Sequence, residues 1–290
     1  MTDLPPNSAA QRGAHTAAAR WRLPFSRQAW RGLSGNWLGA GAGSSLDFQD
    51  HRTYVPGDDP RHIHWQAFAR TGALTMKLYR AEVAPFVDVA VDVSGSMALT
   101  PEKRGRVDEL VAFCVACADR AGAPVRLHAV AGRALHAVAA DEVRAGRWRE
   151  RLPPPASETA APSPLPWKSG AMKILISDLL FPGEPAAALA GLAAGAGVGV
   201  ILAPALAAEA ALPWRGNVEL TDCETAAVRR QRIDEALAGR YAAAYARHFS
   251  LWREAARRRG VLFARVAAEG ELTAALGGEA FAAGAVEAVN

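Results

Sequence analysis

From residue 85 onward, short β-branched segments alternate with segments whose apolar residues repeat at helical spacing. The pattern predicts strands over residues 86–92, 124–130, 134–138, 172–178, 198–203, 217–221 and 261–266. It predicts helices over residues 102–120, 141–151, 186–194 and 224–258. Such alternation is typical of a parallel sheet with helices on both faces. We therefore expect an α/β fold, doubly wound around a mostly parallel sheet.

The 290 residues divide by composition into three parts. Residues 1–31 are rich in arginine and alanine and are expected to form a flexible basic arm. Residues 32–84 form a dense charged and aromatic segment, and residues 85–290 form the α/β domain. No apolar run approaches the roughly 20 residues that cross a bilayer, and the first residues lack the apolar stretch of a secretory signal. With only three cysteines, these features predict a cytoplasmic protein without a membrane span.

Two predicted strands end on carboxylates, Asp92 and Asp178. The first strand continues as Asp92-Val-Ser94-Gly95-Ser96, in which alternate side chains carry oxygen atoms. In an extended loop these alternate side chains point to the same side, and Gly95 permits a tight bend. Carboxylate and hydroxyl oxygens suit Mg²⁺ or Mn²⁺. The sequence thus predicts a metal site of Asp92, Ser94 and Ser96, completed by Asp178. The alternative is that Asp92 caps the following segment and the serines stabilise a turn.

This D-x-S-x-S loop after a first strand resembles the metal-ion-dependent adhesion site of von Willebrand factor A domains, whose fold is Rossmann-like. The resemblance implies that the serines bind the metal directly and that Asp92 and Asp178 act directly or through water. In that family a threonine from a separate loop adds a ligand. Its usual glycine-threonine context is missing here, and Thr159 is the nearest candidate.

A second motif lies in residues 45–70, SLDFQDHRTYVPGDDPRHIHWQAFAR. It resembles the signature of the bacterial family called domain of unknown function 58, in which such a block precedes a von Willebrand A-like domain. Asp47 stands where the family usually has glutamate. Proteins of this family are often encoded beside MoxR-type AAA+ ATPases, so the resemblance implies an adaptor or co-chaperone role with such an ATPase or its client.

Charged and aromatic residues of this block are candidates for a structural network or for a partner-binding surface, and the sequence leaves both readings open. They are Asp47, Arg52, Tyr54, Asp58, Asp59, Arg61, Trp65 and Arg70. Guanidinium groups match carboxylates in pairs. We expect the aromatic members, together with Ile63 and Phe68, to anchor the network to the core.

Other motifs predict structure rather than chemistry. Cys114-Val-Ala-Cys117 lies within a predicted helix, so core packing is favoured over redox or zinc chemistry. His62 and His64 have no evident third metal ligand. An aromatic stripe along the predicted helix 224–258 is expected to pack on the sheet. The net charge of +4 is too small to demand a nucleic-acid partner.

We therefore predict a non-enzymatic interaction protein that recognises a partner's carboxylate through Mg²⁺ or Mn²⁺. The first alternative is a Mg²⁺-dependent phosphoester hydrolase at the same loop, although the sequence shows neither a general base nor a nucleophile. The second is a nucleic-acid-binding protein that uses the basic arm and the arginines of the predicted helix 224–258. It is disfavoured because no aromatic residues interleave with the helix arginines.

Overall fold

The computed structural model describes residues 8–27, 34–42, 48–56, 58–83, 85–152 and 165–289. Its centre is a six-stranded sheet in the order β12-β9-β8-β5-β6-β7. The strands are β5 (Val87–Asp92), β6 (Val125–Ala131), β7 (Ala134–Val138), β8 (Met172–Ile176), β9 (Val198–Ala205) and β12 (Leu262–Ala267). All neighbours are parallel except β6 and β7. This confirms a mixed α/β architecture with a mostly parallel sheet, consistent with a Rossmann-like fold.

The strand order creates a switch point between β5 and β8. From β5 the chain first builds outward through β6 and β7, and it then returns to β8 on the other side and continues to β9 and β12. Crossovers therefore leave in opposite directions from the carboxyl ends of β5 and β8, which opens a crevice where ligands of such sheets bind. Asp92 ends β5, and Asp178 follows β8 by two residues.

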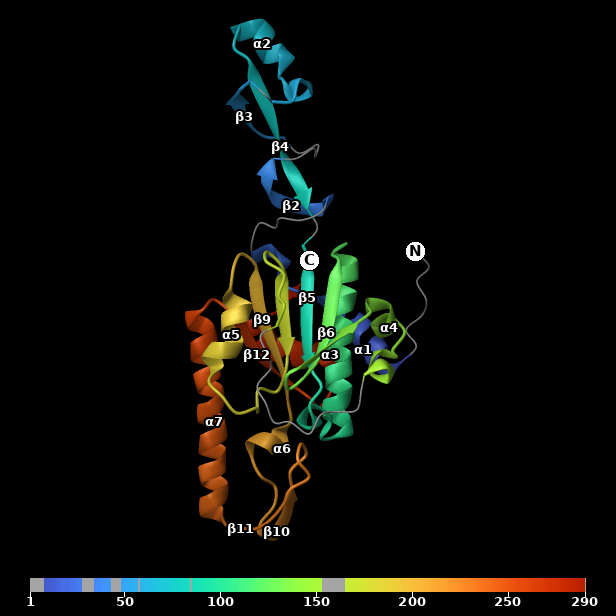
Figure 1. Ribbon diagram of the computed structural model, residues 1–290, viewed down its shortest axis with the longest axis vertical. Helices are drawn as coiled ribbons and strands as arrows, with labels where there is room; N and C mark the ends of the chain where they lie inside the picture. The colour runs from blue at the N-terminus through green and yellow to red at the C-terminus, as the bar shows by residue number, and fades with distance from the viewer. Residues whose placement is uncertain are drawn as a thin grey trace.

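Helices cover both faces of the sheet, as Figure 1 shows. One face packs against α1 (Ala9–Arg20), α3 (Pro101–Arg120) and α8 (Leu272–Ala275), and the other packs against α5 (Pro185–Ala193) and α7 (Glu235–Arg258). Alternate residues of β5 serve the two cores, with Val89 and Val91 on the α3 side and Ala90 on the α7 side. The strands are consequently apolar on both faces.

Residues 8–27 differ from the flexible arm that the sequence suggested. Ser8 and Gln11 form a capping box at the start of α1, and the buried alanines of this helix lie against α3. The strand β1 (Trp21–Arg22) then pairs with β13 (Glu287–Ala288), and η1 (Phe25–Arg27) follows it. Alanine is the best helix former and lets two helices approach closely. The Ala-rich composition therefore marks a packing surface in this segment.

The predicted helix 224–258 begins eleven residues later, at Glu235. The preceding residues form the hairpin of β10 (Gly216–Thr221) and β11 (Val228–Ile233), which pair antiparallel from Thr221↔Val228 to Gly216↔Ile233. The side chain of Asp234 then caps α7 by accepting a hydrogen bond from the Leu237 N–H. Helical periodicity alone did not separate an arginine-rich exposed strand from the helix that follows it.

Two other predicted segments also divide differently. The expected helix 141–151 consists of α4 (Ala140–Arg144) and η4 (Trp148–Arg151), separated by Gly146, whose φ is +71°. The short helices α6 (Ala207–Ala210), η3 (Gly95–Ala98) and η5 (Leu276–Ala280) complete the body. Aromatic residues of α7 pack on the sheet as predicted; Tyr245, Phe249 and Trp252 are buried.

A small sheet stands apart from the central one, in the order β2-β4-β3. It contains β2 (Ser34–Ala42), β3 (Phe48–Thr53) and β4 (Thr75–Val83), with η2 (Pro60–His62) and α2 (Trp65–Thr71) between β3 and β4. In Figure 1 this sheet and the β10–β11 hairpin lie at opposite ends of the molecule. Among the described residues, no helix is both long and apolar enough to span a membrane.

Candidate metal centre

Asp92 lies at the carboxyl end of β5 and is only 6% exposed. Its Oδ1 accepts a hydrogen bond of 2.9 Å from the Ser94 N–H, and its Oδ2 accepts one of 2.8 Å from the Ser177 hydroxyl. Ser177 follows β8 directly, so this bond joins the two strands that flank the switch point. The carboxylate is thus fixed in orientation by a loop amide and by the neighbouring strand end.

The two loop serines converge, as their alternate positions suggested. Ser94 Oγ and Ser96 Oγ lie 3.2 Å apart, and both residues are half-buried. The loop continues into η3, whose Met97 is fully buried and anchors it to the core. Three oxygen-bearing side chains of one loop therefore gather at the end of β5. The turn-stabilising alternative accounts for the Ser94 amide bond to Asp92, because an aspartate commonly bonds the amide two residues on.

Asp178 is buried, and it is paired with a lysine. Its Oδ2 lies 2.7 Å from the Nζ of Lys103, and its Oδ1 accepts a hydrogen bond from the Leu180 N–H. Lys103 is 0% exposed and also pairs with Glu209. Burial lowers the pKa of Lys103, but the carboxylates of Asp178 and Glu209 outweigh burial and raise it above the usual value. Asp178 therefore already has a resident cation beside it.

Sequence reasoning did not find Lys103. The residue sits in the first turn of α3, where Thr100 caps the helix and Pro101 begins it. The first turn of a helix that starts just after a candidate loop points back toward that loop, and this placement was the available signal. Its second partner, Glu209, belongs to α6 and lies 106 residues away in the chain.

Glu224 was also missed. Its Oε2 accepts a hydrogen bond of 2.9 Å from the Gly95 N–H, and its Oε1 accepts one of 2.8 Å from the Ser96 N–H. Glu224 belongs to the turn between β10 and β11, more than 125 residues further along the chain. A carboxylate from the hairpin therefore covers two consecutive amides of the candidate loop. No local motif in the sequence predicted this contact.

The site carries more negative charge than its one ammonium group balances. Burial, and then the charge of Asp178, raise the pKa of Asp92 to about 6. Four carboxylates form hydrogen bonds at the loop, at the end of β8 or with Lys103. They are those of Asp92, Asp178, Glu209 and Glu224. Asp92 has no ion pair with a basic side chain among the described residues. A buried carboxylate without a cation is costly, and bringing one in relieves that cost.

A divalent cation fits this donor set in part. The described residues contain no group of three or more histidine, cysteine, aspartate and glutamate side chains that could hold a metal. Mg²⁺ does not need such a group, because it commonly binds through one or two carboxylates and keeps several waters. Asp92, Ser94 and Ser96 supply one carboxylate and two hydroxyls. Thr159, the proposed further ligand, lies outside the described residues.

The charged residues of the 45–70 block form short-range pairs at the other end of the molecule. Arg52 holds Asp58 with two hydrogen bonds of 2.8 and 2.5 Å, and Asp58 also accepts the Val55 N–H. Arg61 likewise holds Asp59, and hydrogen bonding to Arg61 lowers the pKa of Asp59 to about 2. These pairs are exposed and span two to six residues. They stabilise the turn before η2, and each contributes the small free energy that is typical of exposed ion pairs.

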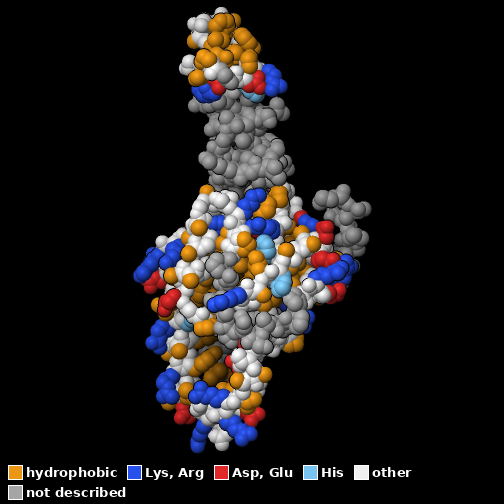
Figure 2. Space-filling view, viewed as in Figure 1, with side chains coloured by type: hydrophobic (Ala, Val, Ile, Leu, Met, Phe, Trp, Pro, Cys, Tyr) orange, Lys and Arg blue, Asp and Glu red, His pale blue; other side chains and the backbone are white. Residues whose placement is uncertain are grey.

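The aromatic members of this block do not all anchor it. Ile63 is buried and Tyr54 is half-buried, but Trp65 and Phe68 are 57% and 39% exposed and contact each other edge to face. No residue of α2 is buried, and apolar side chains gather at this end of the molecule in Figure 2. Arg70 is exposed in the last turn of α2, and Asp47 lies outside the described residues. The expectation that Trp65 and Phe68 pack into the core is therefore wrong.

The motifs expected to be structural are placed accordingly. Cys114 and Cys117 are free, buried thiols in α3, and burial raises the pKa of Cys117 to about 12. His64 stacks on His51, with His51 Nε2 and His64 Nδ1 3.0 Å apart. His62 belongs to η2 rather than to a strand shared with His64.

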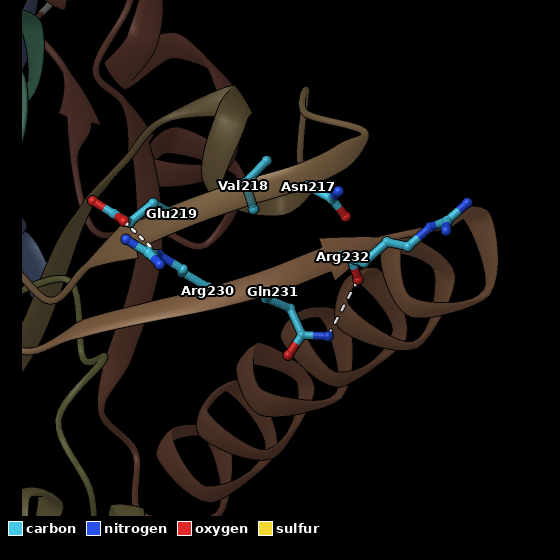
Figure 3. A pocket seen from close by; sticks show the side chains of 6 residues that line it. All are labelled: Asn217, Val218, Glu219, Arg230, Gln231 and Arg232. Carbon is cyan, nitrogen blue, oxygen red and sulfur yellow. Dashed lines mark hydrogen bonds and ion pairs between the residues drawn. The ribbon is translucent and has the colours of Figure 1, made fainter.

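A separate hollow of about 460 Å³ lies beside the hairpin, as Figure 3 shows. It is lined by residues of β10 and β11, with the exposed pair Glu219 and Arg230 at one side. None of the predicted metal ligands lines it. We place the candidate chemistry at the end of β5 instead, because buried charge and convergent oxygens occur there and not in this open hollow.

Fold and site together define a Rossmann-like α/β protein with an oxygen-rich loop at the switch point of its sheet. The model of the family described as "Protein of unknown function DUF58" matches residues 50–148, which include most of the 45–70 block whose resemblance to this family the sequence suggested. No curated protein matches this chain. The chain is similar to the crystal structure of the conserved hypothetical protein BatB from Bacteroides thetaiotaomicron. The identity is 19% over 69% of this chain and 98% of that chain, with a TM-score of 0.34.

Proposed function

We propose that this protein is a non-enzymatic interaction protein that binds a carboxylate of a partner through a divalent cation at the D-x-S-x-S loop. One observation carries the proposal: the buried carboxylate of Asp92 begins a loop in which the Ser94 and Ser96 hydroxyls lie 3.2 Å apart, and it has no ion-pair partner among the described residues. The strand order, with this loop at the switch point, supports a fold of von Willebrand A type. The cation in this proposal is Mg²⁺ or Mn²⁺, which hard oxygen donors suit.

In this proposal the side chains of the chain have distinct roles. Asp92, Ser94 and Ser96 would hold the cation, and the bound cation would supply an electrophilic position that accepts a partner's carboxylate oxygen. Ser177 keeps the Asp92 carboxylate oriented. Lys103 holds Asp178 in place and balances part of its charge. The ion pair therefore weakens the repulsion between the Asp178 and Asp92 carboxylates.

Two observations weigh on the alternative functions. A phosphoester hydrolase needs a free nucleophile or general base, and Asp178 is paired with Lys103. The nucleic-acid alternative relied on a basic arm and on the arginines of the predicted helix 224–258, but residues 8–27 of the arm pack on the body. Turnover of generic phosphoesters that is lost in Asp178→Asn would favour the hydrolase, and strongly salt-dependent binding to DNA or RNA would favour the other alternative.

The metal part of the proposal is tested by thermal unfolding with and without Mg²⁺. At a Mg²⁺ concentration one hundred times Kd, linkage stabilises the fold by about 2.7 kcal/mol. For a domain of this size this corresponds to a rise in Tm of roughly 5–10 °C. Asp92→Asn should abolish the rise.

Asp88→Asn is the matched control, because Asp88 is equally buried but lies at the other end of β5, paired with Arg126. This variant loses stability but should keep the Mg²⁺ response. An unchanged response in Asp92→Asn, or no response in the wild type, contradicts the proposed metal site.

The partner part is tested separately. We expect a partner such as a MoxR-type AAA+ ATPase or its client to co-purify in Mg²⁺, to be released by EDTA and to be lost with Asp92→Asn. Retention in EDTA would show that recognition does not use the cation.

A further inference from the structure

The turn between β10 and β11 sits directly on the candidate loop. Glu224 places one carboxylate oxygen on each of two consecutive amides, those of Gly95 and Ser96, at 2.9 and 2.8 Å. A Cβ atom at position 95 would overlap the carbonyl oxygen of Cys223. Only glycine at this position lets the turn approach so closely. The loop thus binds a carboxylate and the backbone that carries it.

The turn is built to present Glu224. Asp222 Oδ1 accepts hydrogen bonds from the Glu224 and Thr225 N–H groups, at 2.9 and 2.8 Å. Ala226 adopts a φ of +57°, a conformation that alanine rarely takes. Sparsely populated backbone conformations persist where the surrounding contacts impose them, and they cluster at functional segments.

The hairpin that carries this turn is weakly held elsewhere. Its two strands form a separate sheet, and of their residues only Ile233 is buried. The hollow beside it leaves both strands partly unpacked, as Figure 3 shows. Few buried contacts and an exposed ribbon are features of segments that open locally at low cost. The Glu224 contact is therefore one of the main bonds that hold the tip of the hairpin down.

Charge alone does not account for the contact. The neighbouring carboxylates, Asp92 and Asp178, repel a further anion, and Glu224 is nevertheless held at this loop by two amides. Paired backbone N–H groups at the start of a short helical turn form a receptor for an anion. Glu224 is a carboxylate, the class of group that the proposed function assigns to the partner, and it is held at the loop amides beside the proposed cation ligands.

We propose that Glu224 is an internal ligand of the D-x-S-x-S loop. The hairpin occupies the position of a partner's acidic turn, and a partner binds by displacing it. The inference deepens the proposed function and rests on it for the identity of the site. The partner element it implies is an aspartate or glutamate on a tight turn, with a backbone carbonyl that fits against Gly95.

Hydrogen exchange tests the internal contact without any metal. In EDTA, Glu224→Gln should speed the exchange of the Gly95 and Ser96 amides roughly tenfold to a hundredfold, because each loses a charged acceptor. Glu219→Gln is the matched control, since Glu219 lies on the same hairpin and pairs with the exposed Arg230. Gly95→Ala should release the turn by a steric route while Glu224 is kept. A near-ultraviolet spectrum like that of the wild type checks that the variants are folded.

A peptide of the chain's own residues 219–229, with serine in place of Cys223, probes the receptor. In Mg²⁺ it should bind the Glu224→Gln protein at least roughly tenfold more tightly than the wild type, since the internal turn no longer competes at high effective concentration. A peptide in which glutamine replaces its glutamate at position 224 should not bind.

The outcomes separate this inference from the proposed function. Amide exchange that is unchanged in Glu224→Gln, or equal peptide binding to both proteins, overturns the internal ligand even if Mg²⁺ stabilises the wild type through Asp92. Faster exchange together with tighter peptide binding supports it. If that result comes without any Mg²⁺ response, the internal ligand stands and the metal-dependent function fails.

Discussion

Replacing Lys103 by methionine tests the electrostatic reading of the site. Methionine keeps the length and the apolar stem but removes the ammonium, whose side chain is 0% exposed. Asp178, 3% exposed at its side chain, and Glu209, 10% exposed, are then left without their cation. Breaking a buried ion pair from one side costs about 3–5 kcal/mol. We expect Lys103→Met to lose about that much free energy of unfolding at pH 7.5, measured by urea denaturation in EDTA.

The sign of the pH dependence follows from the same groups. The pKa of Lys103 is raised, so its stabilising contribution is fully present below its unfolded value of 10.5 and is lost only as the pH rises through the higher folded value. The Lys103 ammonium of the wild type therefore stays charged from pH 6 to 9. In the variant the stranded carboxylates can be relieved by protonation, so the loss should shrink at pH 5.

Two further variants make the result decisive. Lys173→Met removes another buried lysine, one that bonds the carbonyls of Gly191 and Ala194. The carboxylate whose charge acts on it, Asp88, keeps its ion pair with Arg126 in this variant. The loss in free energy of unfolding caused by Lys173→Met should not shrink between pH 7.5 and 5. Adding Asp178→Asn to Lys103→Met should restore part of the stability. A loss below about 1 kcal/mol for Lys103→Met, or a pH response equal to that of Lys173→Met, would refute the reasoning.

Three other predictions concern thiols and tryptophans. Cys223 is exposed and should react with a thiol reagent in the native protein, whereas Cys114 and Cys117 should react only after unfolding, because both are buried; three fast thiols would contradict this. Trp252→Ala should cost about 3–5 kcal/mol because its side chain is fully buried. Trp65→Ser should change the free energy of unfolding by less than about 0.5 kcal/mol, and a larger loss in urea denaturation would show that α2 is packed.

The local sequence pattern was sufficient to predict most strands of the central sheet. The strands predicted at 86–92, 134–138 and 198–203 match β5, β7 and β9 within one or two residues at each end. The runs were readable because strands buried on both faces are continuously apolar. The N-terminal helix was not predicted, since the reason for its order is a surface of α3 that lies about a hundred residues away.

In the candidate site, too, some residues could be predicted from the sequence and others were found only in the structure. Asp92, Ser94 and Ser96 were readable because they are close in sequence and end a recognisable strand. Lys103 bonds Asp178 across 75 residues, and Glu224 bonds Gly95 across 129. Local spacing gives no sign of the Glu224 contact, and for Lys103 it gives only the position in the first turn of α3. Each depends on which crossover returns to which side of the sheet.

By itself the sequence determined that strands alternate with helices, that two strands end on carboxylates and that a serine-bearing loop follows the first. These are properties of short stretches, governed by periodicity and turn chemistry. The tertiary structure decided which charges meet there: a lysine beside Asp178 and a hairpin carboxylate on the loop amides. The physical reason is that the parallel strand order brings distant chain segments to one edge of the sheet, where burial makes each pairing energetically large.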